Sequence, residues 1–520
     1  MDEFPFVFER IASTTWAYLS SLLMLALFFK FNRFWSVRNF DLFLIILLAP
    51  GLLMVEGGRR WVLDQQRLQA SELNVVEGES NDVVDESVID PNSESGNVSS
   101  ETVSNSPDPS QAGADDTEEK SPIVNAIEAK DTKGHAWQRW GYYWLFSVGL
   151  ILLIRLLLDP SLSRRPVLEP NMTIGGLVFF GCSLMIFLFA NLVTAQPTQD
   201  DLQGARAAVK LMQREAAQDS DTEQLVRRGP GYMLFNLIPI IPSFENGQQL
   251  LQANPNANDD VARYIIAAKS LAIASQVFIV LGLVCFCHYN YNNFNVGVGT
   301  ATIYLMLPYT AVYTGHVLHI LPAALLVWAL VCIRKPWVAG ILIGFSIGVS
   351  YYPIFLIPLW VSFYWERGIK RFTWGLLPSI GLGIGGLAFT SVDFADFGQQ
   401  VQAMFGFWVP IMDGLEGIWA LGWSQWWRLP LVVTFILFCV SFVAWPSEKN
   451  IGTLIAYSGA IMVGIQFWHG FGGGLYMAWY LPMVLLAIFR PNLNGRVALA
   501  ELEEIKRPPR EPAEDLQPAA

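Results

Sequence analysis

The sequence predicts an all-α polytopic transmembrane helical bundle, and three observations support this prediction. Of its residues, 53% are hydrophobic and 15% are charged, and the mean hydropathy is +0.37. Many apolar runs approach the roughly 20 residues that a helix needs to cross a bilayer, and they suggest about thirteen spans. Lysine and arginine gather in alternate gaps between these runs, which is typical of a chain that crosses the membrane repeatedly.

The expected spans follow the apolar runs from the N-terminus onward. They cover residues 11–29, 41–55, 141–158, 173–194, 264–287, 295–314, 317–333, 337–350, 352–365, 373–392, 428–445, 451–468 and 473–489. The runs 41–55 and 337–350 are short for a span, so we expect a tilted or re-entrant segment at each. The run 11–29 lacks a basic region before it, which predicts a retained anchor instead of a cleaved signal peptide.

The basic residues set the expected orientation. Clusters at 334–335 and 370–371 belong to one set of alternate gaps, and positive charge near span ends stays in the cytoplasm. We therefore expect a multi-pass protein of the cell membrane with its N-terminus outside and its C-terminus in the cytoplasm. The loops expected on the outer side are 56–140, 195–263 and 393–427.

Composition divides the chain into four parts. Residues 1–62 are predicted to form a two-helix membrane hairpin, and residues 136–492 a polytopic bundle. Between Arg67 and Lys120 the sequence has no basic residue and is rich in Asp, Glu, Ser and Asn. Such a composition buries too little apolar surface to offset the entropy of ordering, which predicts a disordered acidic linker over 63–135. Residues 493–520 are expected to be a disordered cytoplasmic tail.

An acidic pair opens the long outer loop that follows the span 173–194. Asp200 and Asp201 begin a polar segment in which Leu202, Ala205 and Ala208 recur at roughly helical spacing. This pattern predicts an amphipathic helix on the outer face, with both carboxylates in its first turn. Two interpretations stay open, because an Asp at a helix start can be a cap, and a carboxylate can also accept a proton from a hydroxyl nucleophile.

A resemblance to a known family lies in the central segment. Residues 288–371 contain Leu307-Pro-Tyr309, a short turn with Gly315-His316, then Arg334-Lys-Pro336 and a Gly-rich run that leads into Tyr352-Pro353. This succession resembles the polytopic GT-C-type glycosyltransferases, and within them the polyprenol-phosphate-mannose-dependent mannosyltransferases. The resemblance extends over roughly residues 173–490, and its motifs are loose.

The resemblance implies an activity and a set of site residues. Family members place a catalytic acid in the first long outer loop, shortly after a span, where this chain has Asp200 and Asp201. The implied reaction transfers a sugar, with mannose as the candidate, from a polyprenyl-phosphate carrier to an outer-face hydroxyl of a glycan or lipid acceptor. The residues expected to contact substrate are His469, Tyr352, His316 and Arg228.

One departure from the family concerns the donor phosphate. The family often has a lysine three residues before the proline of its Tyr-Pro motif, and here Ser350 occupies that position. A serine hydroxyl donates one hydrogen bond but brings no charge. Phosphate binding must then come from an outer-side arginine, or the protein is a non-catalytic relative. The arginines considered, whose other interpretation is contact with solvent or lipid headgroups, are Arg227, Arg228, Arg263 and Arg428.

Several other patterns have simple structural interpretations. Gly340, Gly344 and Gly348 repeat every four residues, which predicts a close-packing stripe between helices. The tryptophans of loop 393–427 fit an aromatic belt at the membrane surface better than a saccharide platform. Arg155 lies near an inner helix end, where its side chain is expected to snorkel towards water.

The sequence leaves three classes of function open. The first is the glycosyltransferase, which takes a lipid-linked sugar as donor, needs no other cofactor and has membrane lipid around it. His316 and His319 share a helix face, but no third metal ligand is evident, so no metal site is predicted and a divalent-metal requirement stays open. The second class is a non-catalytic membrane scaffold. The third is a transporter of lipid or solute, which the scarcity of charges within the spans disfavours. Nucleic acid is not an expected partner.

Overall fold

The computed structural model describes residues 12–82, 122–162, 170–195, 197–213, 228–244, 258–366, 368–405, 414–446 and 449–491. Throughout these ranges the ordered backbone is helical, and no strand occurs in them. The prediction of an all-α fold is confirmed. Chain contacts separate two compact units, Met1–Leu53 with Gly141–Ala520, and Met54–Trp140.

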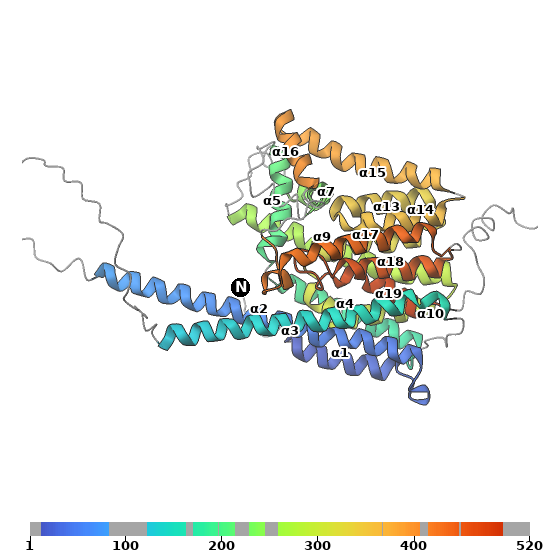
Figure 1. The fold of residues 1–520 in the computed structure, drawn as a ribbon, viewed down its shortest axis with the longest axis horizontal. Coiled ribbons are helices and arrows are strands. Elements are labelled where there is room, and N and C mark those ends of the chain that lie inside the picture. The colour runs from blue at the N-terminus through green and yellow to red at the C-terminus, as the bar shows by residue number, and fades with distance from the viewer. Residues whose placement is uncertain are drawn as a thin grey trace, which may run out of the picture. The chain divides into compact units, whose positions relative to one another are not determined.

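The described helices follow one another along the whole chain (Figure 1). The α-helices are α1 (Ser13–Phe28), α2 (Val37–Asp82), α3 (Pro122–Leu157), α4 (Ile174–Thr194), α5 (Gln199–Gln213), α7 (Pro230–Ile240), α9 (Asn258–Tyr291), α10 (Phe294–Met306), α11 (Pro308–Tyr313), α12 (Val317–Val331), α13 (Pro336–Val349), α14 (Ile357–Tyr364), α15 (Ile369–Thr390), α16 (Phe394–Phe405), α17 (Arg428–Ala444), α18 (Ile451–Ile465) and α19 (Leu481–Ile488). The short 3₁₀ helices are η1 (Phe31–Arg33), η2 (Asp159–Ser161), η3 (Ile241–Ser243), η4 (Tyr352–Leu356), η5 (Gly417–Ala420), η6 (Gln425–Trp427) and η7 (Met477–Trp479).

Helix length and composition within the described residues are those of a membrane protein. Segments long and apolar enough to cross a bilayer are Val37–Leu68, Lys133–Leu157, Ile174–Thr194, Asp260–Tyr291 and Gln425–Ala444. Shorter apolar helices are Ser13–Phe28, Phe294–Met306, Val317–Val331, Pro336–Val349, Tyr352–Tyr364 and Ile451–Ile465. These helices support a membrane-embedded chain, while the count of about thirteen spans stays a prediction.

Two expected spans contain breaks that hydropathy does not detect. The run 295–314 divides into α10 and α11, because Pro308 has no N–H to continue the helical ladder and begins a new helix. The run 473–489 becomes a loop, η7 and the eight-residue α19, with Pro482 in the first turn of α19. The run 41–55, by contrast, lies within the uninterrupted α2, and this helix is longer than the short segment expected there.

The unit Met54–Trp140 contains the C-terminal part of α2 and the N-terminal part of α3. The two helices approach closely at Gly58, where an added Cβ would lie 2.6 Å from the carbonyl oxygen of Gly134. The expected disordered linker, 63–135, differs from the structure at both ends, because α2 continues to Asp82 and α3 begins at Pro122. The intervening residues 83–121 lie outside the described part of the chain.

Close packing at the glycine stripe agrees with its interpretation from sequence. A Cβ at Gly340 would overlap the carbonyl oxygen of Phe372, and one at Gly344 would overlap the hydroxyl of Ser379, so α13 and α15 pack backbone to backbone. Beside the third glycine of the stripe, Gly348, the start of α7 leaves no room for a Cβ at Gly229. The stripe therefore joins α13 to two neighbouring helices.

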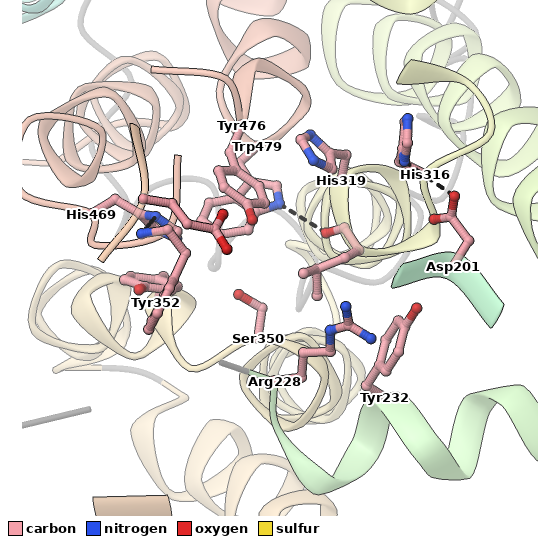
Figure 2. Close-up of a pocket in the computed structure, with 13 residues that line it drawn as sticks. Asp201, Arg228, Tyr232, His316, His319, Ser350, Tyr352, His469, Tyr476 and Trp479 are labelled. Atoms are coloured by element: carbon pink, nitrogen blue, oxygen red, sulfur yellow. Dashed lines mark hydrogen bonds and ion pairs between the residues drawn. The ribbon is translucent and has the colours of Figure 1, made fainter. Parts of the chain in front are cut away.

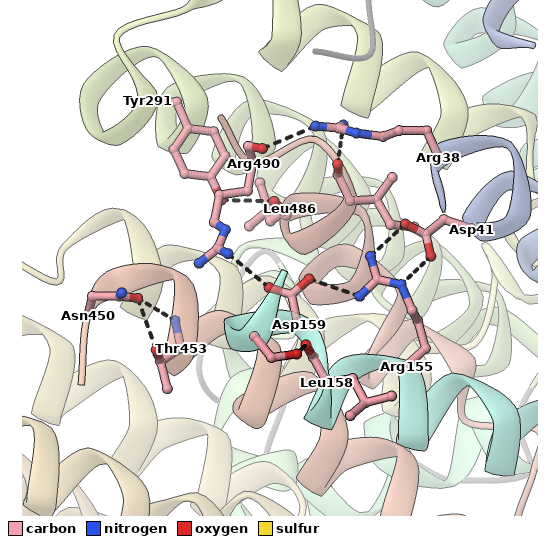
Figure 3. A network of polar contacts seen from close by, with 12 residues as sticks. Arg38, Asp41, Arg155, Leu158, Asp159, Tyr291, Asn450, Thr453, Leu486 and Arg490 are labelled. Atoms are coloured by element: carbon pink, nitrogen blue, oxygen red, sulfur yellow. Dashed lines mark hydrogen bonds and ion pairs between the residues drawn. The ribbon is translucent and has the colours of Figure 1, made fainter. Parts of the chain in front are cut away.

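A buried charge network corrects the interpretation of Arg155. Its guanidinium does not snorkel: Nε and Nη2 donate to the two carboxylate oxygens of Asp41 at 2.6 and 2.8 Å, and Nη1 donates to Asp159 at 3.0 Å (Figure 3). Asp41 is 1% exposed and Asp159 is fully buried. Buried carboxylates need such partners because removing an isolated ion from water costs on the order of several kcal/mol.

The same network reaches the C-terminal end of the bundle. The guanidinium of Arg490 lies 3.2 Å from Asp159, and Arg38 donates to the backbone carbonyl oxygens of Ile488 and Arg490. Helix α2 and η2 are thereby tied to the end of α19 and to Arg490 after it, as Figure 3 shows.

The polar segment after α4 forms α5, the amphipathic helix that the sequence predicts. Its apolar residues Leu202, Ala205, Ala208 and Val209 are buried against Ile240 of α7, against Phe244 and against residues of α9. Figure 1 shows α5 running across the end of the bundle, next to α7. The apolar face of α5 therefore rests on protein, and this packing holds the first turn of α5 at the bundle end.

Candidate functional site

A polar pocket opens where several loop and helix ends meet at this end of the bundle (Figure 2). It lies among the start of α5, the start of α7, the turn before α12, the link between α13 and η4, and the segment between α18 and η7. Its volume of about 70 Å³ corresponds to roughly five water molecules. The residues that line it are Asp201, Arg228, Tyr232, His316, Leu318, His319, Ser350, Tyr352, Glu416, His469, Phe471, Tyr476 and Trp479.

Asp201 is held by its own helix turn and by a histidine from another helix. The backbone N–H and the hydroxyl of Thr198 donate to Oδ2 of Asp201 at 3.3 and 2.7 Å. The bond from the Thr198 N–H is one half of a capping box, in which a carboxylate of the first turn accepts from a backbone N–H at the helix start. Nδ1 of His316, at the start of α12, lies 3.2 Å from the same oxygen. The cap interpretation is thus correct for Asp201, and the carboxylate also faces the pocket (Figure 2).

The surroundings of Asp201 keep it ionised at neutral pH. Burial raises the pKa of this carboxyl, but the hydrogen bond and charge of His316 lower it, and so do the hydrogen bonds from Thr198. The lowering contributions prevail, so the pKa lies below its ordinary value. The carboxylate can therefore accept a hydrogen bond or a proton from a ligand hydroxyl in the pocket.

Tight packing of α5 on α7 positions a second wall of the pocket. A Cβ at Gly204 would overlap the ring of Tyr232, so only glycine allows α7 this close to α5. The guanidinium of Arg228 lies over the Tyr232 ring, with Cζ 5.1 Å from the ring centroid. The Tyr351 hydroxyl donates to the carbonyl oxygen of Arg228 at 3.2 Å. These contacts hold a buried cation, 6% exposed, at the pocket wall.

Ser350 presents a hydroxyl to the pocket from the end of α13. The residue is 1% exposed, and its Oγ has no hydrogen-bond partner among the described residues. Figure 2 shows this hydroxyl between Tyr352 and Arg228, directed into the pocket. A buried hydroxyl without a partner is costly, so a bound ligand or water is its natural partner.

Aromatic rings form the remaining wall. His319 stacks on Tyr476, with ring centroids 4.2 Å apart and an interplanar angle of 12°. The ring centroids of Tyr476 and Trp479 are 4.5 Å apart. The Tyr309 hydroxyl is 2.8 Å from Nδ1 of His319, which fixes the imidazole orientation. Tyr352 and His469 have ring centroids 4.3 Å apart. Flat faces of this kind offer a stacking surface to an apolar ligand face.

His469 is neutral in this setting. Burial and the nearby charge of Arg428 lower the pKa of its imidazole to about 3. The N–H of Phe471 donates to Nδ1 at 3.1 Å, which places the single ring proton on Nε2. The indole N–H of Trp419 donates to the backbone carbonyl oxygen of His469 at 3.0 Å and so braces the loop. His469 can serve as a hydrogen-bond donor to a ligand without changing charge.

The structure brings together most of the residues nominated from sequence. Asp201, Arg228, His316, Tyr352 and His469 all line the pocket, although they come from distant parts of the chain. Their functional roles stay predictions.

The remaining nominated residues fall into two groups. The side chain of Asp200 and all of Arg227 lie outside the described residues. Arg263 pairs with Asp260 at 3.0 Å and lies over the Phe244 ring, and neither Arg263 nor Arg428 lines the pocket.

Several lining residues were not nominated as site residues from sequence. Tyr232, Tyr476 and Trp479 lie in apolar stretches where an aromatic residue is ordinary, and no local pattern distinguishes them. His319 offered a signal, because it shares a helix face with His316. Among the described residues, no group of three or more His, Cys, Asp or Glu side chains is arranged to hold a metal ion.

The arrangement suits a small polyhydroxylated ligand. One wall carries an ionised carboxylate, another a guanidinium and a hydroxyl that has no partner in the described part of the chain, and the third offers aromatic faces. No family model matches the chain, and neither curated proteins nor solved structures give a significant match.

Proposed function

We propose that the protein is a membrane glycosyltransferase of GT-C type that moves a sugar, with mannose as the candidate, from a polyprenyl-phosphate carrier to an acceptor hydroxyl of a glycan or lipid. The observation that carries this proposal is the pocket itself. It places Asp201, paired with His316, in one small space with Arg228 and with stacked aromatic rings. A base, a cation for phosphate and a surface for a sugar ring are the groups that this reaction needs.

The proposed reaction balances without any other cofactor. The acceptor oxygen attacks the anomeric carbon and forms the new glycosidic bond, while the bond from that carbon to the phosphate oxygen breaks. The bonding electron pair leaves with the lipid phosphate, and the acceptor proton passes to Asp201. Attack opposite the leaving group inverts the anomeric configuration. His316 hydrogen-bonds the carboxylate through Nδ1 and keeps it oriented.

The proposal includes the topology derived from sequence. With the N-terminus outside, the segments that form the pocket belong to the outer side of a bundle of about thirteen spans in the cell membrane. Trp426 and Trp427, which are exposed in η6 directly before α17, belong to the loop for which the sequence predicts an aromatic belt at that surface. A lipid carrier delivers the activated sugar to this side, so no nucleotide site is required.

A non-catalytic membrane scaffold is the second candidate. Ser350, in the position where the resembled family often has lysine, favours it, because Arg228 is then the one Lys or Arg side chain among the described lining residues that can meet a phosphate. A transporter gains no support from the buried charges of α2, α3 and η2, because Arg155 pairs with both Asp41 and Asp159.

Supplying donors to membranes separates the two candidates. Membranes containing the overexpressed chain would receive radiolabelled polyprenyl-phosphate mannose or polyprenyl-phosphate glucose, with membranes lacking the chain as the control. The glycosyltransferase predicts label in a new glycan or glycolipid that depends on the chain. The scaffold predicts the same labelling with and without the chain for every donor tested.

A further inference from the structure

An apolar groove lies on the flank of the bundle between α7, α13 and α15. Its walls carry the side chains of Leu234, Phe235, Ile238, Phe345 and Leu382, and its volume is about 280 Å³. Its outermost side chains are well exposed, with Ile238 at 65% and Leu382 at 60%. Exposed apolar side chains on helices of this composition are expected to face hydrocarbon.

Among the described residues that line the groove, Ser379 alone carries a hydroxyl, and it does not make the wall polar. Its Oγ donates to carbonyl oxygens of its own helix, those of Gly375 and Leu376, at 3.1 and 2.8 Å. The Ser379 hydroxyl therefore needs no hydrogen bond from a ligand, and a hydrocarbon chain matches the apolar walls of the groove.

The groove and the polar pocket meet at one seam of the chain. Gly348 lines the groove, and Ser350, two residues later, lines the pocket. On the facing segment, at the start of α7, Gly231 lines the groove and Arg228 lines the pocket. The N–H of Gly229 donates to the carbonyl oxygen of Val349 at 3.1 Å, which fixes the two segments to each other.

The polar side of this seam is suited to an anion. The guanidinium of Arg228 lies over the Tyr232 ring, and its backbone carbonyl oxygen accepts a hydrogen bond from the Tyr351 hydroxyl. The Ser350 hydroxyl points into the same space, buried and with no partner among the described residues (Figure 2). A guanidinium and a hydroxyl are donors only towards an anion, and a phosphate accepts from both.

We infer that the seam is the seat of a lipid phosphate: Arg228 and Ser350 hold the phosphate, and the groove between α7, α13 and α15 holds the isoprenoid chain next to it. The identity of the lipid as a polyprenyl phosphate rests on the proposed function. In this chain the arginine from the start of α7 then supplies the positive charge, and Ser350 contributes a neutral hydrogen bond.

The test measures binding without sugar transfer. The purified full-length chain in nanodiscs would be irradiated with a polyprenyl phosphate that carries a diazirine in its first isoprene unit, and the labelled peptides mapped by mass spectrometry. Competitors would be unlabelled undecaprenyl phosphate, undecaprenol, phosphatidylglycerol and inorganic phosphate. We expect label on α7, α13 or α15 and competition by undecaprenyl phosphate at least tenfold stronger than by the other three.

Two pairs of variants distinguish a loss of lipid binding at this site from a general loss of folding. Gly383→Phe fills the groove, and an added Cβ there meets only Pro230 at 3.6 Å, so the backbone has room. Its control is Gly385→Phe on the same helix, where a Cβ meets nothing within 4 Å and the residue does not line the groove. Arg228→Gln removes the cation, with Arg263→Gln as the matched control.

The expected result is a loss of labelling with Gly383→Phe and an affinity for undecaprenyl phosphate at least tenfold weaker with Arg228→Gln, while both controls bind like wild type. A tenfold loss of affinity corresponds to about 1.4 kcal/mol. Label outside α7, α13 and α15, or variants equal to their controls, overturns the inference, as does equal competition by phosphatidylglycerol. Binding at this seat without any transfer contradicts only the proposed function. Transfer that survives both variants contradicts only the seat.

Discussion

Removing Arg155 should destabilise the bundle far more than removing an arginine from a surface pair. The side chain is 11% exposed and engages two carboxylates, Asp41 and Asp159, whose side chains are 2% and 1% exposed. Arg155→Ala leaves both carboxylates buried with fewer partners, and breaking such a buried pair costs about 3–5 kcal/mol. Asp41→Asn removes one of the two charges and should lower the cost of the second substitution, with a coupling of about 0.5–3 kcal/mol in the double variant.

The assay is unfolding in mixed micelles with increasing sodium dodecyl sulfate, followed by the fluorescence of the 19 tryptophans. The matched control is Arg263→Ala, whose pair with Asp260 has side chains 32% and 13% exposed. Its ion pair and its contact with the Phe244 ring together should contribute no more than about 1–2 kcal/mol. Equal destabilisation by Arg155→Ala and Arg263→Ala, or no coupling with Asp41→Asn, would refute the network as a source of stability.

Two further predictions concern the pocket. His316→Gln removes a contact that lowers the pKa of Asp201. The acid limb of the pH profile of the transfer rate should then move to higher pH, because a carboxylate with a higher pKa becomes protonated earlier as pH falls. An unchanged pH profile would contradict this. Gly204→Ala forces a Cβ into the Tyr232 ring and should destabilise the chain by about 1–3 kcal/mol and lower transfer, whereas Gly175→Ala, with open space around it, should do neither when both are compared by thermal stability and rate.

Local patterns in the sequence were sufficient for part of this structure. The spacing of Leu202, Ala205 and Ala208 predicts α5, and the stripe from Gly340 to Gly348 predicts close helix packing, because both depend on residues near one another in the chain. Breaks such as that before Pro308 were missed, because a hydropathy window averages over a proline that interrupts the hydrogen-bond ladder.

Contacts between distant residues could not be derived from these patterns. Arg155 and Asp41 are 114 positions apart, and nothing in either local sequence indicates that they meet. The same limit applies to the pocket, where Asp201 and His316 were nominated separately and the wall formed by His319 and Tyr476 was not foreseen. A pairing of this kind depends on the helix arrangement, which a single sequence does not specify.

The central claim is that Asp201 accepts the acceptor proton during sugar transfer. The most direct measurement compares the rate of transfer from labelled polyprenyl-phosphate mannose by wild type, Asp201→Asn and the neighbouring Asp200→Asn at matched expression. Removing a general base lowers a rate by about 10²–10⁴-fold, so we expect that loss with Asp201→Asn and a much smaller one with Asp200→Asn. Wild-type transfer by Asp201→Asn would reduce this carboxylate to the helix cap that it forms with Thr198.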